Sequence, residues 1–211
     1  MHHNTPSTDY ESPFWTKKQL VAGVDEAGRG PLAGPVVAAA VILPINSSVH
    51  LGFNDSKKLT ELQRNELVEV IQSLALSIGI SFIDTVEIEK LNIRRATLKA
   101  MQVAVDSLHE SPHHVFIDGN YFEHSSRSYT TVVKGDAKVL SISAASIVAK
   151  VTRDKWMCEI ADTQYPEYGF AQHKGYGTKQ HCEAIKKYGP CPIHRSLFLR
   201  KLLGETQVTL F

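Results

Sequence analysis

Few cysteines and no long apolar run restrict the class of protein that this sequence can encode. The three cysteines, Cys158, Cys182 and Cys191, are an odd number without a close pair, unlike the disulfide framework of small secreted domains. No cleavable signal segment is apparent. The longest apolar run, 36–43, is much shorter than the roughly 20 residues of a membrane-spanning helix. We therefore expect a reduced, cytoplasmic protein without a membrane segment.

A strong net charge is also lacking, because 23 Lys and Arg residues nearly balance 22 Asp and Glu residues. The positive charge is nevertheless concentrated in the segment 170–201, whose only acidic residue is Glu183 and into which His173, His181 and His194 are interleaved. Its basic residues are Lys174, Lys179, Lys186, Lys187, Arg195, Arg200 and Lys201. Such a segment suits contact with phosphate groups, although a solvated helical face produces the same pattern.

The pattern of apolar residues predicts one α/β domain. With 211 residues and 43% apolar content, the chain is long enough for one buried core. Strands are predicted at 20–25, 36–43, 49–53, 77–83, 114–118 and 130–134. Helices are predicted at 60–76, 84–105, 142–162, 179–187 and 196–203. This order indicates a mixed sheet with helices on both faces and a small helical C-terminal segment. We expect a disordered start at 1–14, the domain at 15–204 and a tail at 205–211.

Four acidic residues stand at the ends of predicted strands. Asp25 and Glu26 end the first strand, and Asp118 and Asp136 end two others. Side chains beyond the carboxyl ends of neighbouring strands converge, and converging carboxylates raise one another's pKa unless cations neutralise them. A cluster of oxygen ligands suits Mg²⁺ or Mn²⁺, and two such ions could clamp a phosphodiester. These four acids therefore predict a divalent-metal site.

Simpler roles stay open for each acid taken alone. Any one of them could cap a turn or form an ion pair with Arg29 or Lys134. The adjacent pair 25–26 would face opposite sides of a regular strand, so we expect the strand to end or bulge there. Asp154, on an apolar helix face between two basic residues, is left out of the predicted site.

A glycine-rich segment follows the first pair of acids. Its glycines have the spacing G-x-G-x-x-x-G, and Pro31 and Pro35 interrupt any following helix, which excludes a dinucleotide-binding loop. Gly28 and Gly30, on either side of Arg29, would let the backbone approach a sugar or phosphate closely. A tight turn between strands is the simpler alternative. A zinc site in the C-terminal segment is rejected, because its histidines and cysteines lack short C-x₂-C pairs.

The sequence resembles the ribonuclease HII family, the type 2 ribonucleases H, in motifs that keep the family's order. They lie at 23–36, 55–59, 118–119, 134–136, 144–154, 173–177 and 192–195. Together they cover the chain from about 20 to 200, and their length makes chance agreement improbable. The resemblance implies a ribonuclease H-like fold. The N-terminal stretch before the first motif is shorter than the extension of the related type 3 enzymes.

The resemblance also implies a catalytic site. Asp25, Glu26, Asp118 and Asp136 match the family's catalytic carboxylates, which hold Mn²⁺ or Mg²⁺. The family hydrolyses the RNA strand of RNA/DNA hybrids and cuts 5′ to single ribonucleotides in duplex DNA, leaving 3′-hydroxyl and 5′-phosphate ends. We therefore expect an endonuclease that acts by two-metal-ion hydrolysis. Its partners would be hybrid and ribonucleotide-containing duplexes, bound by a monomer.

Substrate recognition is implied by two further matches. Gly28, Arg29 and Gly30 match the loop that senses the 2′-hydroxyl, the group that distinguishes RNA from DNA. Tyr176 matches the tyrosine that stacks on the sugar at the RNA–DNA junction. Two other functions stay open: a binder of hybrid duplex without catalysis, which would not need all four acids, and a structure-specific DNA nuclease of the same broad fold.

The last five residues resemble the peptide by which bacterial replication proteins dock on the sliding clamp. Gln207 begins this segment, and Leu210 and Phe211 would be its apolar anchors. A frayed apolar tail is the alternative. We predict that the tail binds the clamp.

Overall fold

The computed structural model describes residues 6–47 and 59–204. The strand expected at 49–53, all but Leu59 of the motif 55–59, and the clamp-like tail with Gln207, Leu210 and Phe211 lie outside these residues. Within the described ranges, no helix is both long and apolar enough to cross a membrane.

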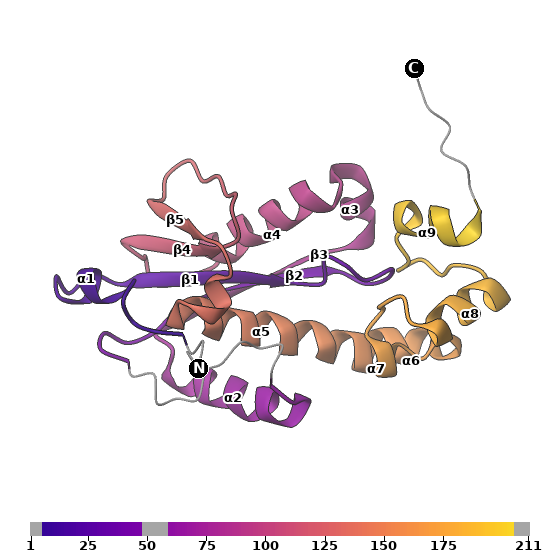
Figure 1. The fold of residues 1–211 in the computed structure, drawn as a ribbon, viewed down its shortest axis with the longest axis horizontal. Helices are drawn as coiled ribbons and strands as arrows, with labels where there is room; N and C mark the ends of the chain where they lie inside the picture. Colours follow the sequence, from indigo (N-terminus) through magenta and orange to yellow (C-terminus); the bar gives the residue numbers. More distant parts are fainter. Residues whose placement is uncertain (1–5, 48–58, 205–211) are drawn as a thin grey trace, which may run out of the picture.

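A mixed sheet forms the centre of the described chain, with its strands in the order β3-β2-β1-β4-β5 (Figure 1). The strands are β1 (Val21–Ala27), β2 (Val36–Ile42), β3 (Ser77–Ile83), β4 (His114–Asp118) and β5 (Tyr129–Val132). The first three are antiparallel neighbours, whereas β4 is parallel to both β1 and β5. β2 is buried along its whole length, because helices cover both faces of the sheet.

Two layers of helices enclose the sheet. On one face lie α2 (Glu61–Leu74) and α5 (Leu140–Trp156), and on the other α3 (Thr85–Leu91) and α4 (Ile93–Asp106) (Figure 1). α5 approaches β1 very closely at Gly23. A Cβ added there would lie 2.1 Å from the carbonyl carbon of Ser141. Only a glycine therefore lets this helix pack at its observed depth.

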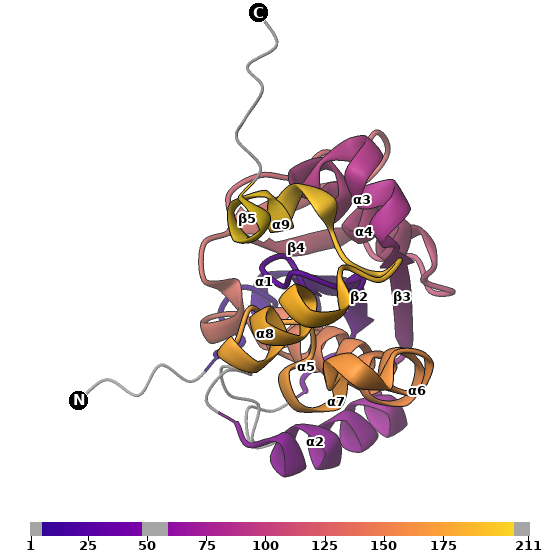
Figure 2. The ribbon, with the colours of Figure 1, turned by 90° about the vertical axis from the view of Figure 1, so that its right-hand side faces the viewer.

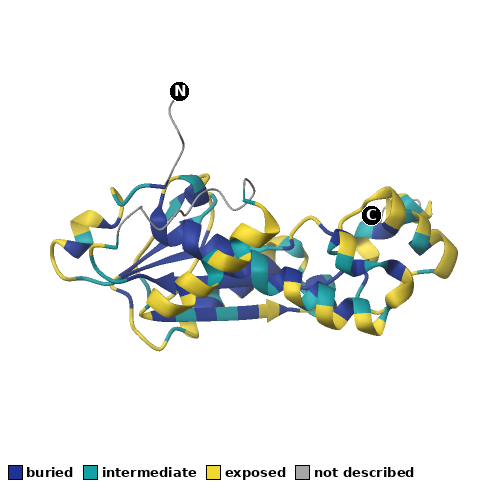
Figure 3. Ribbon diagram, turned by 90° about the horizontal axis from the view of Figure 1, so that it is seen from below, coloured by how far each residue is buried: buried dark blue, intermediate teal, exposed yellow. Residues whose placement is uncertain are grey.

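A lobe of short helices follows α5 and lies beyond one end of the sheet (Figure 1), on the side that faces the viewer in Figure 2. It contains a π-helical turn (Met157–Ala161), α6 (Asp162–Gln164), a 3₁₀ turn (Pro166–Tyr168), α7 (Phe170–His173), α8 (Lys179–Tyr188) and α9 (Ser196–Leu203). Buried residues run along the sheet and α5 and recur inside this lobe (Figure 3). Ala33 of the glycine-rich segment packs into the lobe's core with Met157 and Phe170.

The predicted mixed sheet with helices on both faces is confirmed, and the bounds of β3, β4 and α9 match the prediction. The single helix predicted at 84–105 is wrong. Asn92 has a φ of 66° and divides it into α3 and α4. The Asn92 side chain accepts hydrogen bonds from the amides of Arg94 and Arg95, and so begins the second helix.

Part of the stretch 1–14, for which we expected a disordered start, lies within the described residues. Residues 6–14 are described, and α1 (Ser12–Trp15) begins among them. Glu11 is completely buried, where it accepts hydrogen bonds of 2.9 Å from the amide and hydroxyl of Ser141. Burial raises the pKa of the Glu11 carboxyl. This contact holds the N-terminal segment on the first turn of α5.

The three histidines of the C-terminal segment are buried and do not contribute to its basic surface. His194 accepts a hydrogen bond of 2.9 Å from the Cys191 amide at Nδ1, and its Nε2 lies 3.0 Å from Nε2 of His181. Nδ1 of His181 donates to the carbonyl of Tyr176 at 2.9 Å. A carbonyl only accepts, so this chain of bonds fixes the tautomers of both rings. Burial lowers both pKa values to about 4, which keeps both imidazoles neutral near pH 7.

We expect Gly23→Ala to lower the free energy of unfolding by about 2 kcal/mol or more, because the added methyl group would force α5 away from β1. Urea denaturation measures this loss. Gly30→Ala is the matched control, since no heavy atom lies within 4 Å of a Cβ built at Gly30. Equal stability of the two variants would contradict the close packing described here.

We expect the free energy of unfolding to fall as the pH is lowered from 6.5 to about 4. The folded pKa values of His181 and His194 lie below that of a free imidazole, so the unfolded chain binds more protons in this window. The loss should be on the order of 1–2 kcal/mol per imidazole at pH 5. Urea titrations at several pH values in this range should show that the free energy of unfolding depends less steeply on pH in His181→Gln than in the wild type. The exposed control His113→Gln should keep the wild-type slope.

Candidate active site

The acids of β1 and β4 meet because these two strands are parallel neighbours. Val24 pairs with Ile117, so Asp25 and Asp118 follow at the same level of the sheet. The expectation that β1 ends or bulges at 25–26 is wrong, because its regular pairing with β2 continues to Ala27. The pairing with β4 stops at Val24 instead. β1 therefore extends past its parallel neighbour, and its acids lie along an open side of the strand.

A cleft of about 480 Å³ opens at this place. It is lined by Asp25, Glu26, Ala27, Gly28, Arg29, Gly30, Arg64, Asp118, Ser146, Lys150 and Tyr176. Three of the four predicted acids, the whole predicted 2′-hydroxyl loop and the predicted stacking tyrosine are among these residues. Segments far apart in the sequence thus supply carboxylates, backbone groups and an aromatic ring to one cavity.

The surroundings of the cleft raise the pKa values of two of its carboxylates, Asp25 and Glu26. Burial raises the pKa of Asp25 well above its usual value, and the negative charges of Glu26 and Asp118 raise it further. The Ser146 hydroxyl and the Glu26 amide, 2.7 Å away, donate to Asp25 and oppose this shift. The pKa of Glu26 is also raised by burial, although Arg29 at 3.1 Å lowers it. Burial and neighbouring negative charge therefore both disfavour the ionised form of Asp25.

Asp136 does not line the cleft. β5 ends at Val132, and Asp136 is buried in the 3₁₀ turn Gly135–Ala137 rather than at a strand end. The turn nevertheless contacts the cleft, because the amide of Gly135 donates to Oδ1 of Asp118 at 2.6 Å. Asp136 is thus next in sequence to a residue that binds a cleft carboxylate, and its side chain is the one predicted acid outside the lining residues.

A hard divalent cation fits the chemistry of this donor set. The acids offer only oxygen ligands, as Mg²⁺ and Mn²⁺ prefer. Burial is the main cause that raises the pKa values of Asp25 and Glu26, with neighbouring negative charge as a further cause, and a bound cation would favour their ionised forms. As the side chains stand, no three His, Cys, Asp or Glu residues of the described chain are arranged to enclose a metal ion. The carboxylates are turned toward Ser146, Arg29 and the Gly135 amide instead.

The glycine-rich loop is held from behind by a buried arginine. The guanidinium of Arg195 donates to the carbonyls of Gly28 (2.7 Å), Arg29 (3.1 Å) and Pro31 (2.9 Å). It also donates twice to the carbonyl of Gly34, at 3.0 and 2.7 Å. Burial lowers the pKa of Arg195 to about 9, so the group still carries its charge at pH 7. The loop therefore closes around this cation.

Tyr176 is presented by a turn whose backbone is tied to the same loop. The amide of Leu32 donates to the carbonyl of Gly175 at 2.8 Å. Tyr176 is 43% exposed, and Nζ of Lys150 lies 5.5 Å from the centroid of its ring. The ring is thus available to a ligand in the cleft, and a cation flanks it.

Several residues at the cleft were not predicted from the sequence. Ser146 and Lys150 line it from α5, and Arg64 from α2. Arg195 was counted in the basic segment, yet it is completely buried and cannot reach a phosphate at the surface. Asp154 was left out of the predicted site, and it pairs with Lys150 at 2.8 Å without lining the cleft. A helical spacing of four links residues 146, 150 and 154, which is the one signal that could have found Ser146.

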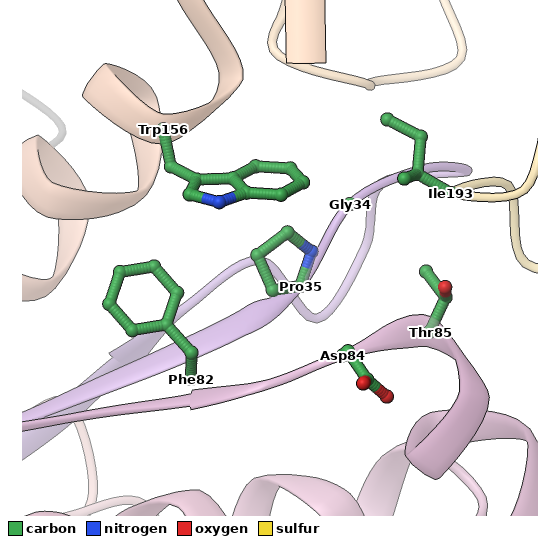
Figure 4. Close-up of a pocket in the computed structure, with 7 residues that line it drawn as sticks. All are labelled: Gly34, Pro35, Phe82, Asp84, Thr85, Trp156 and Ile193. Atoms are coloured by element: carbon green, nitrogen blue, oxygen red, sulfur yellow. The ribbon is translucent and has the colours of Figure 1, made fainter. Parts of the chain in front are cut away.

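A second cavity, of about 390 Å³, lies beside the end of the glycine-rich loop (Figure 4). Trp156, Phe82, Pro35 and Ile193 make its lining mostly apolar. Its polar side chains are already engaged: Asp84 accepts from the Glu87 amide at 2.8 Å, and Thr85 donates to the Pro192 carbonyl at 3.2 Å. None of the four predicted acids lines this cavity. The acidic cleft is therefore the candidate active site.

Known proteins resemble this chain over most of its length. The sequence profile of the family described as Ribonuclease HII matches residues 22–201. The Ribonuclease HII of Acetivibrio thermocellus is 55% identical over 185 residues, which are 88% of this chain and 72% of that protein. The Ribonuclease HII of Psychromonas ingrahamii is 52% identical over 198 residues, 93% of this chain and 96% of that protein.

Solved structures share the fold. The ribonuclease H2 from Pyrococcus horikoshii matches with a TM-score of 0.73 and 30% identity, over 87% of this chain and 96% of that one. The Archaeoglobus fulgidus RNase HII in the PCNA:RNase HII complex matches with a TM-score of 0.69 and 22% identity, over 84% and 94% of the two chains. Bst-RNase HIII in complex with Mn²⁺ matches with a TM-score of 0.62 and 17% identity, over 92% and 73%. The last two likenesses concern the fold alone.

The family match covers most of the chain and includes every residue of the acidic cleft. The ribonuclease H-like fold predicted from the resemblance is confirmed. Ribonuclease H activity is metal-dependent hydrolysis by an endonuclease, which the oxygen-rich cleft suits. The chain belongs to the ribonuclease HII family and is a ribonuclease H endonuclease.

Proposed function

We propose that this enzyme hydrolyses the RNA strand of RNA/DNA hybrids and also cuts 5′ to single ribonucleotides embedded in duplex DNA, leaving 3′-hydroxyl and 5′-phosphate ends. The observation that carries this proposal is the composition of one cleft. Asp25, Glu26 and Asp118 line it together with the loop 28–30 and Tyr176. Groups suited to hydrolysis and groups suited to recognising a ribose would therefore face the same nucleotide when a substrate binds.

We propose that Asp25, Glu26, Asp118 and Asp136 hold two Mn²⁺ or Mg²⁺ ions. Bound divalent cations supply a nucleophilic water and stabilise the charge on the departing 3′ oxygen. The fold neighbour Bst-RNase HIII was solved in complex with Mn²⁺. Asp136 would join the other three through the turn at Gly135, whose amide already binds Asp118. The Ser146 hydroxyl would orient Asp25 by its hydrogen bond.

The remaining cleft residues would bind and orient the substrate. The backbone of Gly28, Arg29 and Gly30 would contact the 2′-hydroxyl, since Gly28 and Gly30 have no side chain that would keep a ligand away from the peptide groups. The exposed Tyr176 ring would stack on the sugar beyond the ribonucleotide. Lys150, which lines the cleft beside this ring, would contact the phosphate backbone.

We expect a labelled duplex with one ribonucleotide to be cut on its 5′ side in the presence of Mn²⁺ or Mg²⁺. An all-DNA duplex of the same sequence should stay intact, and chelator should abolish cleavage. Asp118→Asn should reduce cleavage by about a thousandfold or more with little loss of duplex binding, because it removes a charged oxygen ligand from the cleft. Denaturing gels measure the product, and fluorescence anisotropy measures binding.

Asp106→Asn is the matched control, because Asp106 is exposed on α4 outside this cleft. It should cleave at the wild-type rate. Near-normal turnover by Asp118→Asn would remove Asp118 from the catalytic group. Binding of hybrid without any cleavage would favour a binder that lacks catalysis. Equal cleavage of the all-DNA duplex would favour a structure-specific DNA nuclease.

We propose further that the C-terminal tail docks on the replication sliding clamp through Gln207, Leu210 and Phe211. The support is the resemblance of this peptide to clamp-binding peptides, together with the Archaeoglobus fulgidus RNase HII, which was solved as a PCNA:RNase HII complex. An apolar pair at the end of a short peptide can fill a pocket as a local anchor.

A peptide of residues 204–211 should bind purified bacterial clamp with a dissociation constant on the order of micromolar, typical of short-peptide docking. Fluorescence anisotropy of the labelled peptide measures it. The peptide with Leu210→Ala and Phe211→Ala should lose at least tenfold in affinity, because both anchors are removed. A titration without saturation, or equal binding of the two peptides, would show that the tail does not recognise the clamp.

A further inference from the structure

Arg195 is a basic residue in the interior of the protein. Its side chain is completely buried, and the described chain gives it no carboxylate partner. Taking a guanidinium out of water is costly unless its donors are satisfied. Here they are satisfied by four backbone carbonyls of residues 28–34, all of them in the glycine-rich loop. The loop's backbone direction is therefore set by this one side chain.

The direction of the carbonyls determines the direction of the amides. In a trans peptide, the C=O of one residue and the N–H of the next point in opposite directions. The carbonyls of Gly28 and Arg29 point inward to Arg195. The N–H groups of Arg29 and Gly30 therefore point away from it, and both residues line the cleft. The structure gives these two amides no acceptor within the described residues.

A second buried arginine joins this loop to the turn that carries Tyr176. Arg153 donates to the carbonyls of Pro35 (2.9 Å), Ala33 (3.0 Å) and Lys174 (3.0 Å). The two segments also touch directly, because a Cβ built at Gly175 would lie 2.6 Å from the Ala33 carbonyl oxygen. The amides that face the cleft and the tyrosine ring are thus parts of one hydrogen-bonded unit.

We propose that Arg195 is a specificity-determining positioning residue: by holding the loop carbonyls, it aims the amides of Arg29 and Gly30 at the ribose 2′-hydroxyl. The inference rests on the proposed function, in which this loop contacts the 2′-hydroxyl. Lysine cannot replace the guanidinium, because its single ammonium cannot satisfy carbonyls spread around a planar fork. An ammonium has three donors for the four carbonyls, so Arg195→Lys should leave at least one carbonyl without a donor and let its peptide group rotate.

The test compares binding of two duplexes that differ in a single 2′-hydroxyl. All proteins carry Asp118→Asn, so that cleavage does not interfere, and fluorescence anisotropy gives both dissociation constants. We expect Arg195→Lys to reduce the preference for the ribonucleotide duplex over the all-DNA duplex by about tenfold, the effect of one or two hydrogen bonds. Affinity for the all-DNA duplex should stay within about twofold of the parent.

Arg95→Lys is the matched control, because Arg95 is exposed on α4 and does not line the cleft, and it should keep the parent's preference. If Arg195 had only a structural role, Arg195→Lys would weaken binding of both duplexes equally, or it would lower the melting temperature of the protein and leave the preference unchanged. Either result would overturn the proposal. A parent protein without any preference for the ribonucleotide duplex would instead contradict the proposed function.

A second measurement does not need the Arg195→Lys variant, so the proposal can still be tested if that variant does not fold. Amide resonances of Arg29 and Gly30 in the Asp118→Asn protein are followed by NMR as each duplex is added. We expect both resonances to shift further with the ribonucleotide duplex than with the all-DNA duplex. Identical shifts with the two duplexes would show that these amides do not sense the 2′-hydroxyl, and that Arg195 does not position them for it.

Discussion

The parallel pairing of β1 with β4 is the constraint on which the active site depends. It sets Asp25 level with Asp118, and the earlier end of this pairing leaves the acids of β1 on an open side. The close approach of α5 at Gly23 then brings a helical face to the same place. Along that face, residues at a spacing of four follow one another: Ser146 reaches Asp25, and Lys150 reaches the cleft. One strand pairing and one glycine thus assemble groups from three elements.

The buried arginines solve a different problem, which is how to fix a loop that has little side-chain volume of its own. Glycine-rich backbone has many accessible conformations and few packing contacts. Carbonyl groups can offset the burial of a guanidinium by hydrogen bonding without adding a negative charge. A carboxylate in the same position would increase the negative charge near a cleft whose acids already repel one another. Neutral carbonyl partners therefore suit a loop beside an acidic site.

The fold was predictable wherever local pattern and tertiary packing agree. Alternating and continuous apolar stretches indicated the strands, and the acids at their ends indicated three of the cleft carboxylates. The break at Asn92 was not visible, because the apolar stripe from Ile88 to Val105 stays in phase across it. The burial of Glu11 depends on a partner 130 residues away, which no local pattern contains. The roles of Gly28, Arg29, Gly30 and Tyr176 rested on family resemblance, because a glycine loop and a loop tyrosine have many uses.

The surface of the C-terminal segment carries fewer basic groups than its sequence indicated. In the sequence, Arg195 and three histidines stand among the lysines of this segment, but in the structure these four side chains are buried. Once they are removed, the exposed cations of the segment lie on α8 and α9, at Lys179, Lys186, Lys187, Arg200 and Lys201. α8 begins directly after the turn that carries Tyr176, whose carbonyl the His181 ring holds. Because Arg153 ties this turn to the glycine-rich loop, a duplex attracted to the basic helices would meet the acidic cleft in a fixed relation to them.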